Sequence, residues 1–299
     1  MKRIPATLLW VSSLLLFLPA ASCTDTLVGR PDTDDRTITF QTPQADTRAA
    51  VTGTSLTSGS FLVWGGYGGN ATNVFDAVTV TGDNGVWTYE GTRYWKAGET
   101  YNFYAVYPAE LPAGAVADVS PEGTVTVTGF DCSATGEAAV DLMTATKIGM
   151  EGSQPEMVSM KFGHELARVK VSVESNGATV DGLKVYGVGY KGNFNSTGTL
   201  SKWAVTQTAG ENTTPLSGAA PLDMLLLPAT NLTDAKLKVT YHYGNEASAT
   251  RTDEVSLAIE GGWTAGQQYH YKVSIVAGKL TITVTVVDWT EMDTSVSWG

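Results

Sequence analysis

Hydrophobic and polar residues alternate along many short segments of this chain, which is the pattern of β-strands that bury one face. Between Phe61 and Phe130 these segments are FLVWGGY, AVTVTG, GVWTYEG, YNFYAVYP and GTVTVTGF. Turn-forming residues separate them, as in the GDNG sequence at 82–85. A second set of alternating segments runs from residue 158 to residue 289. Short strands at this spacing predict β-sandwiches and not a sheet with helical crossovers.

The stretch 147–155 is weakly patterned, and we interpret it as the approach to a domain boundary. The expected division is an N-terminal β-sandwich at 49–157 and a C-terminal β-sandwich at 158–299. Early in the second set, the apolar residues up to Leu166 share one parity, and those from Val169 onward share the other. Such a change predicts a bulge or a single turn between them.

The alternation continues into the last ten residues, 290–299. Met292, Thr294, Val296 and Trp298 share one face of this tail, and acidic or Ser residues form the other. One interpretation is a free strand that adds to a sheet of another molecule, with Met292, Val296 and Trp298 as its anchors. The other is a strand that completes the chain's own sheet. The pattern allows both.

The N-terminus has the layout of a secretory signal peptide, predicted at 1–22. Lys2 and Arg3 precede an apolar run at 8–18 that is too short to span a bilayer. Small residues lie directly before Cys23, which resembles a bacterial lipobox, although Ala20 stands where Leu is usual. A lipidated Cys23, carrying fatty acyl chains such as palmitate, would tether the protein to a membrane without crossing it. The alternative is an ordinary signal peptide followed by a chance cysteine.

The segment 24–48 is rich in Asp and Thr and contains one short alternating piece. Ile38 and Phe40 share a face there, which predicts a β-strand. Beyond it, Arg48 stands alone in the sequence PQADTRAAV. An isolated arginine is by default a solvated charge. The alternative interpretation is a proteolytic processing site.

Composition narrows the class of function. The chain has a net charge of −11, which disfavours nucleic-acid binding because phosphate contacts need Lys and Arg. None of the three His residues has other ligands at metal-binding spacing, so we expect no metal, no cofactor and no catalytic residues. His164 lies on an apolar parity, where a core or interface imidazole is the expected role. If Cys23 is acylated, Cys132 has no partner for an intramolecular disulfide.

Two motifs suggest other functions. Residues 187–192 fit G-x-G-x-x-G, but the following NFNSTGTL is turn-like, so no helix N-terminus faces a pyrophosphate and we reject a nucleotide site. Aromatic residues crowd 64–95 and could stack on sugars, although core packing is the commoner role. Trp64 and Trp95 would carry such a site. The alternative function is therefore a lipid-anchored surface protein that binds glycan or host protein without polymerising. A hydrolase would need a carboxylate pair in a cleft, and nothing in the sequence selects one.

Several stretches together resemble the fimbrillin-type lipoproteins of Bacteroidales, which are subunits of pili built from lipoprotein precursors. They are YWKAGETYNFYAVYP (94–108), DLMTAT (141–146), FGHELARVKVSV (162–173) and WTAGQQYHYKVSI followed by ITVTVVDW (263–289). The resemblance implies two transthyretin-like β-sandwich domains in tandem. It also implies export to the outer membrane as a lipoprotein and cleavage by a trypsin-like protease after an arginine. The matching bond here is Arg48–Ala49, and the propeptide would be residues 23–48.

Cleavage at that bond would remove the strand around Ile38 and Phe40 and leave an open apolar groove with an unpaired edge. The C-terminal strand of a neighbouring subunit would fill the groove, giving a head-to-tail filament. The resemblance thus implies a cell-surface fimbrium that supports adhesion. Its partners would be other fimbrial subunits, the outer membrane before processing, and a host or bacterial surface ligand. Whether the subunit belongs to the shaft, the tip or the anchor is left open.

Overall fold

The computed structural model describes residues 36–42, 56–199, 201–244, 250–276 and 278–289. These residues form an all-β protein whose helical content is one 3₁₀ turn, η1 (Gly136–Ala138). This confirms the predicted all-β class with several packed sheets. The count of two tandem domains stays a prediction.

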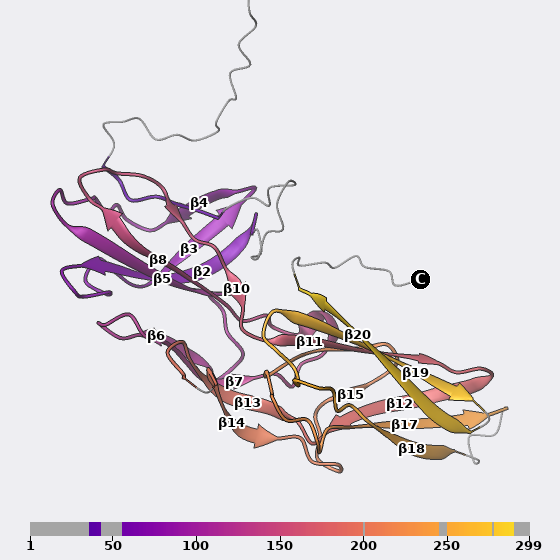
Figure 1. The fold of residues 1–299 in the computed structure, drawn as a ribbon. Helices are drawn as coiled ribbons and strands as arrows, with labels where there is room; N and C mark the ends of the chain where they lie inside the picture. Colours follow the sequence, from indigo (N-terminus) through magenta and orange to yellow (C-terminus); the bar gives the residue numbers. More distant parts are fainter. Residues whose placement is uncertain (1–35, 43–55, 200, 245–249, 277, 290–299) are drawn as a thin grey trace, which may run out of the picture. The chain divides into compact units, whose positions relative to one another are not determined.

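A six-stranded antiparallel sheet organises the N-terminal part of the described chain (Figure 1). Its order is β10-β8-β5-β2-β3-β4. The bounds are β2 (Gly59–Tyr67), β3 (Phe75–Asp83), β4 (Val86–Tyr89), β5 (Thr100–Tyr107), β8 (Met143–Glu151) and β10 (Gly163–His164). The GDNG sequence joins β3 to β4, with Asn84 at φ 49° and Gly85 at φ 81°. Two left-handed residues in succession are what a two-residue hairpin turn needs, so the predicted turn is a local consequence of sequence.

A short parallel pair, β1 (Phe40–Gln41) and β9 (Val158–Ser159), contributes to the same hydrophobic core. Side chains of β1 and β9 join those of β2, β3, β5 and β8 in one buried cluster, which we call the first cluster. Its members also include Met160 and Phe162. The predicted boundary after residue 157 therefore does not coincide with the end of the first cluster. No change in backbone pattern marks the end of a core, because packing alone decides it.

Three four-stranded sheets surround a second and larger cluster of buried side chains. We call it the second cluster, and its members include Val127, Val171, Leu237 and Tyr271. The first has the order β16-β11-β19-β20, with β11 (Ala167–Glu174), β16 (Leu222–Leu226), β19 (Gln267–Val276) and β20 (Lys279–Asp288). The next is β15-β12-β17-β18, with β12 (Ala178–Tyr186), β15 (Ser217–Gly218), β17 (Lys236–Tyr243) and β18 (Arg251–Ser256). The last is β14-β13-β7-β6, with β6 (Val116–Val119), β7 (Val125–Asp131), β13 (Gly189–Asn195) and β14 (Trp203–Thr208).

The sheet β14-β13-β7-β6 joins distant parts of the sequence. Strand β7, which we assigned to the N-terminal sandwich, pairs with β13 from the C-terminal one. Phe130 and Phe194 both lie in the second cluster and both pack against Trp203. The two halves of the chain thus share one sheet and one core at this point.

The parity change after Leu166 corresponds to a crossing between sheets. His164 belongs to β10, which pairs with β8, whereas Ala167 begins β11, which pairs with β16 and β19. Leu166 and Ala167 are consecutive and both fully buried. One strand of a single sheet cannot bury two successive side chains on one face, so the chain turns here.

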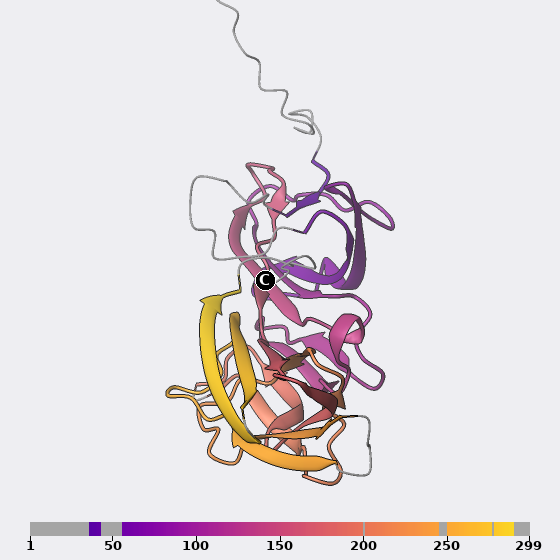
Figure 2. The same cartoon turned by 90° about the vertical axis from the view of Figure 1, so that its right-hand side faces the viewer.

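Strand β20 alternates like the other strands but buries its apolar face only in part. It is the outer strand of its sheet and lies beside β19 along its whole length (Figure 2). Leu280 and Ile282 pack against the second cluster, but Val284 and Val286 are 37% and 42% exposed. Alternation predicts which face a side chain is on, and an edge position leaves part of that face uncovered.

Candidate functional site

The segment 36–42 runs through the first cluster as a strand with partners on both sides. On one side it pairs with the segment 93–95, running antiparallel to it. The Ile38 amide donates to the Arg93 carbonyl at 2.8 Å, and the Trp95 amide donates to the Arg36 carbonyl at 2.8 Å. The backbone edge of the segment that faces 93–95 is therefore paired at these residues.

On its other side the segment pairs with β9, in the parallel direction. The Val158 amide donates to the Thr39 carbonyl at 2.8 Å, and the Met160 amide donates to the Gln41 carbonyl at 2.8 Å. The segment is therefore an inner strand, although 13 residues that the structure does not describe separate Thr42 from Leu56. Removing it would leave two sets of backbone groups without partners.

Alternate side chains of the segment point into the first cluster, as the sequence predicted for Ile38 and Phe40. Ile38 is fully buried, Phe40 is 3% exposed and Thr42 is 9% exposed. The Thr42 hydroxyl donates to the Leu56 carbonyl, which anchors the end of the segment. Ring-centroid distances from Phe40 are 5.3 Å to Phe75, 5.8 Å to Phe103, 5.9 Å to Tyr89 and 6.2 Å to Phe61. Edge-to-face geometry of this kind adds to the stabilisation from burial.

The remaining predicted site residues lie outside the described parts of the chain. These are Cys23, Arg48, Ala49, Met292, Val296 and Trp298. Lipidation at Cys23, cleavage at Arg48 and the role of the tail stay predictions.

The last described residue, Trp289, is held at the point where the tail 290–299 begins. It is 7% exposed, and its amide donates to the Gly266 carbonyl at 2.8 Å. Its ring stacks on His164, with centroids 3.9 Å apart and planes 11° apart. The His164 Nδ1 lies 2.7 Å from an Asp141 carboxylate oxygen. His164 is thus a packed, hydrogen-bonded side chain, as its apolar parity suggested.

The aromatic residues considered for sugar stacking lie mostly in hydrophobic cores. Trp64, Trp87 and Trp95 are 1%, 7% and 3% exposed. A ring must present a face to solvent to stack on a sugar, so Trp64 and Trp95 offer no platform in this conformation. Tyr94 is the exception at 62% exposed, and it neighbours the segment 36–42.

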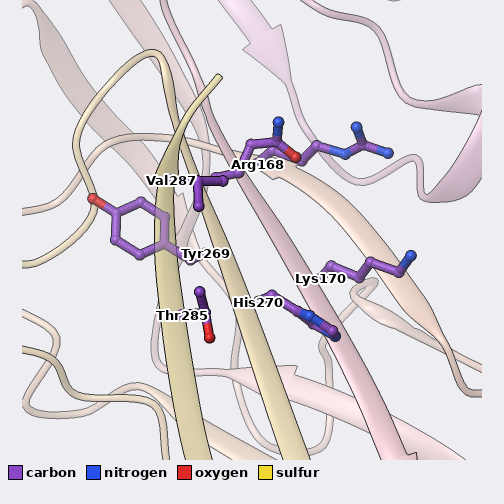
Figure 3. Close-up of a pocket in the computed structure, with 7 residues that line it drawn as sticks. Arg168, Lys170, Tyr269, His270, Thr285 and Val287 are labelled. Carbon is purple, nitrogen blue, oxygen red and sulfur yellow. The ribbon is translucent and has the colours of Figure 1, made fainter. Parts of the chain in front are cut away.

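A pocket lies on the outer face of the sheet containing β11, β19 and β20 (Figure 3). Lys170 and His270 project from neighbouring strands on that face. The Arg168 guanidinium is paired with the Asp223 carboxylate at 2.7 Å, and the Ser172 hydroxyl lies 2.9 Å from His270 Nε2. Burial, then the nearby Lys170 and Lys272 ammonium groups, lowers the pKa of His270. The pocket therefore has a cationic rim without a set of converging groups that would define a ligand.

The G-x-G-x-x-G sequence at 187–192 opens a strand and not a helix. Gly187 has φ 74° and follows β12, and Gly189 begins β13. A Cβ on Gly187 would lie 1.9 Å from the Asp234 carbonyl oxygen, so close backbone packing explains this glycine. The rejection of a dinucleotide site agrees with this geometry.

Metal sites and membrane-spanning helices were considered within the described ranges. In them, no group of three or more His, Cys, Asp or Glu residues could hold a metal ion. Among the same residues, no helix is long and apolar enough to cross a membrane.

Sequence reasoning missed a polar contact at the beginning of the segment 36–42. The Arg36 guanidinium donates to the Trp95 carbonyl at 2.7 Å and 3.0 Å, and to the Gly152 carbonyl at 2.9 Å. The two acceptors are backbone atoms from separate loops. No side-chain signal could have identified them, because every residue carries a carbonyl group.

By fold, the chain is an all-β sandwich protein. It resembles a candidate cell adhesion protein from Bacteroides uniformis, with a TM-score of 0.59 and 20% identity over 86% of this chain and 100% of the other. It also resembles a fimbrial protein from Bacteroides vulgatus, with a TM-score of 0.57 and 17% identity over 86% and 100% of the two chains. At these identities the likeness shows the fold alone.

The chain belongs to the fimbrillin-like family, whose profile matches residues 47–289. A search of curated protein sequences finds no match. Family membership supports a role as a fimbrial subunit at the cell surface, associated with other fimbrial subunits, and a structural role in place of a catalytic one.

Proposed function

We propose that this protein is the precursor of a fimbrial subunit that polymerises by donor-strand exchange after its N-terminal strand has been removed. The observation that carries the proposal is the position of the segment 36–42. It completes a hydrophobic core and pairs on both sides, yet it precedes the rest of the fold in sequence. A strand placed in this way leaves a complete groove when it departs.

The connection between this strand and the rest of the fold supports a single cleavage point. Between Thr42 and Leu56, Arg48 is the one Lys or Arg. A trypsin-like protease acting there would cut the Arg48–Ala49 bond and disconnect the strand. A cut at Arg36 would leave Ile38 and Phe40 attached to the mature chain. The Arg36 carbonyl is moreover bonded within the sheet.

Removal of the strand would create a surface that is unstable in water. The pockets of Ile38 and Phe40 would open, and the amides of Trp95, Val158 and Met160 would lose their acceptors. An extended peptide with alternating apolar side chains restores both kinds of interaction. The groove therefore has the chemistry of a strand acceptor.

The tail 290–299 is the proposed donor to the next subunit. Val296 and Trp298 are spaced by two residues, as are Ile38 and Phe40, and Met292 extends the same face. Because Trp289 is buried and bonded to Gly266, the tail starts from a fixed point of the fold. One acceptor groove and one donor tail at different places on a subunit generate an open head-to-tail filament.

Lipid on Cys23 would hold the precursor at the outer membrane until cleavage. The same cut at Arg48–Ala49 removes the lipidated residue and the resident strand together. Release from the membrane and activation for assembly then depend on one peptide bond. The assembled fimbrium would support adhesion at the cell surface.

The test uses purified full-length precursor and an arginine-specific protease. We expect a new N-terminus at Ala49 and detergent-stable ladders on a gel, and the Arg48→Gln variant should give neither. A precursor truncated after Trp289 should still be cut but should end chain growth, because it has a groove and no tail. A cut product that stays monomeric, or growth past the truncated subunit, would contradict the mechanism.

A further inference from the structure

The contact made by Arg36 lies at the end of the groove where the resident strand enters. Its guanidinium bridges two carbonyl oxygens, of Trp95 and of Gly152, with three hydrogen bonds of 2.7–3.0 Å. The two acceptors are 57 residues apart in sequence and meet only in the folded protein. We call this pair of carbonyls the guanidinium notch.

Close backbone packing fixes the notch. The Gly152 amide donates to the Glu99 carbonyl at 2.8 Å, and a Cβ on Gly152 would lie 2.1 Å from the Lys96 carbonyl oxygen. Any other residue would push this loop away from the turn at 96–99. Trp95 is held in turn by its ring, which is buried in the first cluster. The notch is thus a preformed feature of the groove wall.

The chemistry of the notch selects a planar cation. Two carbonyl oxygens present negative partial charge without a carboxylate, and a guanidinium supplies several N–H donors in a rigid fork. An ammonium group has the charge but not the fork. A neutral amide has fewer donors and no charge, and hydrogen bonds to charged groups are the stronger ones.

The proposed donor tail has nothing to put into the notch. Residues 290–299 contain no Lys and no Arg. When this tail replaces the resident strand in a neighbouring subunit, the three bonds of Arg36 are lost whichever register the tail adopts. The notch therefore favours the resident strand over the tail.

From this geometry we infer that the carbonyls of Trp95 and Gly152 form a binding site for a guanidinium, and that this site retains the resident strand after cleavage. The guanidinium must stand two residues before the first inward side chain of the strand, as Arg36 stands before Ile38. This regulation rests on the proposed function, because retention matters only if the strand is exchanged. It slows exchange, so that a cut subunit keeps its groove covered until a donor strand displaces the propeptide. A donor strand carrying Arg at the matching position would bind more tightly than one without it.

The experiment measures release of the resident strand and does not require polymerisation or cleavage at Arg48. Full-length precursor carries Arg48→Gln and an inserted site for a sequence-specific protease after residue 48. After cleavage, excess unlabelled peptide of residues 36–42 prevents rebinding, and the N-terminal fragment that still co-elutes with the subunit is followed over time. The urea concentration is kept below the unfolding transition and is chosen so that the fragment of the parent protein is released within hours.

The variants separate the notch from general effects on the strand. Because the guanidinium is partly exposed, we expect Arg36→Gln to speed release by about tenfold, the low end for bonds to a charged group. The release rate of Arg36→Lys should fall between those of the parent and Arg36→Gln. Thr39→Gln changes an outward side chain of the same strand and should release at the parent rate. Since the acceptors are neutral, raising the salt to about 0.5 M should leave the ratio of the Arg36→Gln release rate to the parent release rate unchanged.

Equal release rates for the parent and Arg36→Gln would overturn the inference, as would an equal acceleration by Thr39→Gln. If the Arg36→Gln precursor fails to fold, the stripped parent subunit is titrated with peptides of residues 36–42 with and without this change. A dissociation constant about tenfold weaker for the changed peptide is then expected, and equal constants refute the notch. Failure of ladder formation in the earlier test would count against donor-strand exchange and not against this result.

Discussion

Replacing Phe40 by alanine tests whether the N-terminal strand is part of the precursor's core. The ring is 3% exposed and packs edge-to-face against several aromatic rings of the first cluster. Truncating a buried phenylalanine to alanine costs about 3–5 kcal/mol, through lost transfer free energy and the cavity that remains. The loss cannot exceed the free energy that docks the segment 36–42, because a weakened strand can detach. We therefore expect the lower end, about 3 kcal/mol.

The assay is amide hydrogen exchange of the precursor, combined with urea unfolding. The amides of Val158 and Met160 donate to the segment 36–42, so they report its detachment directly. A loss of about 3 kcal/mol corresponds to protection lower by about two orders of magnitude at these amides. Thr39→Ala changes an outward side chain of the same strand and should stay within about 0.5 kcal/mol of the parent protein. Unchanged protection in Phe40→Ala, or an equal loss in Thr39→Ala, would refute the claim that Phe40 docks the strand.

Three further predictions concern the rest of the fold. Tyr271→Phe should lower the free energy of unfolding by about 1–3 kcal/mol, because the hydroxyl accepts from Trp263 Nε1 at 2.9 Å and donates to a backbone carbonyl; an unchanged urea midpoint would contradict this. Burial raises the pKa of the Cys132 thiol, so a thiol reagent should modify Cys132 only as the protein unfolds, and rapid labelling in native buffer would show that the site is open. Burial also raises the pKa of Asp141, despite its bond to His164, so the native state holds this proton more tightly than the unfolded state. Stability should fall as the pH rises from about 4 through the raised pKa, and Asp141→Asn should remove that part of the pH dependence in thermal melts; an identical pH profile would argue against it.

Local pattern was sufficient wherever a residue's neighbours in sequence decide its state. Alternation identified most strands, including the short piece with Ile38 and Phe40 on one face, because side chains of a strand point to opposite faces in turn. The GDNG turn was likewise readable, since its two left-handed residues are set by local sterics. The apolar parity of His164 correctly indicated a packed imidazole.

Only the tertiary structure decided which strands meet. Segment 36–42 lies between 93–95 and β9, and β7 pairs with β13, yet nothing in these stretches marks a partner so far away. Backbone donors and acceptors are the same at every residue, so pairing depends on how whole side-chain sets pack together. The burial of Trp64 and Trp95, the uncovered part of β20 and the bridge from Arg36 to two carbonyls all follow from that packing. The sequence by itself thus determined an all-β chain with a strand-like segment before Arg48, and the tertiary structure decided that this segment is an inner strand of the core.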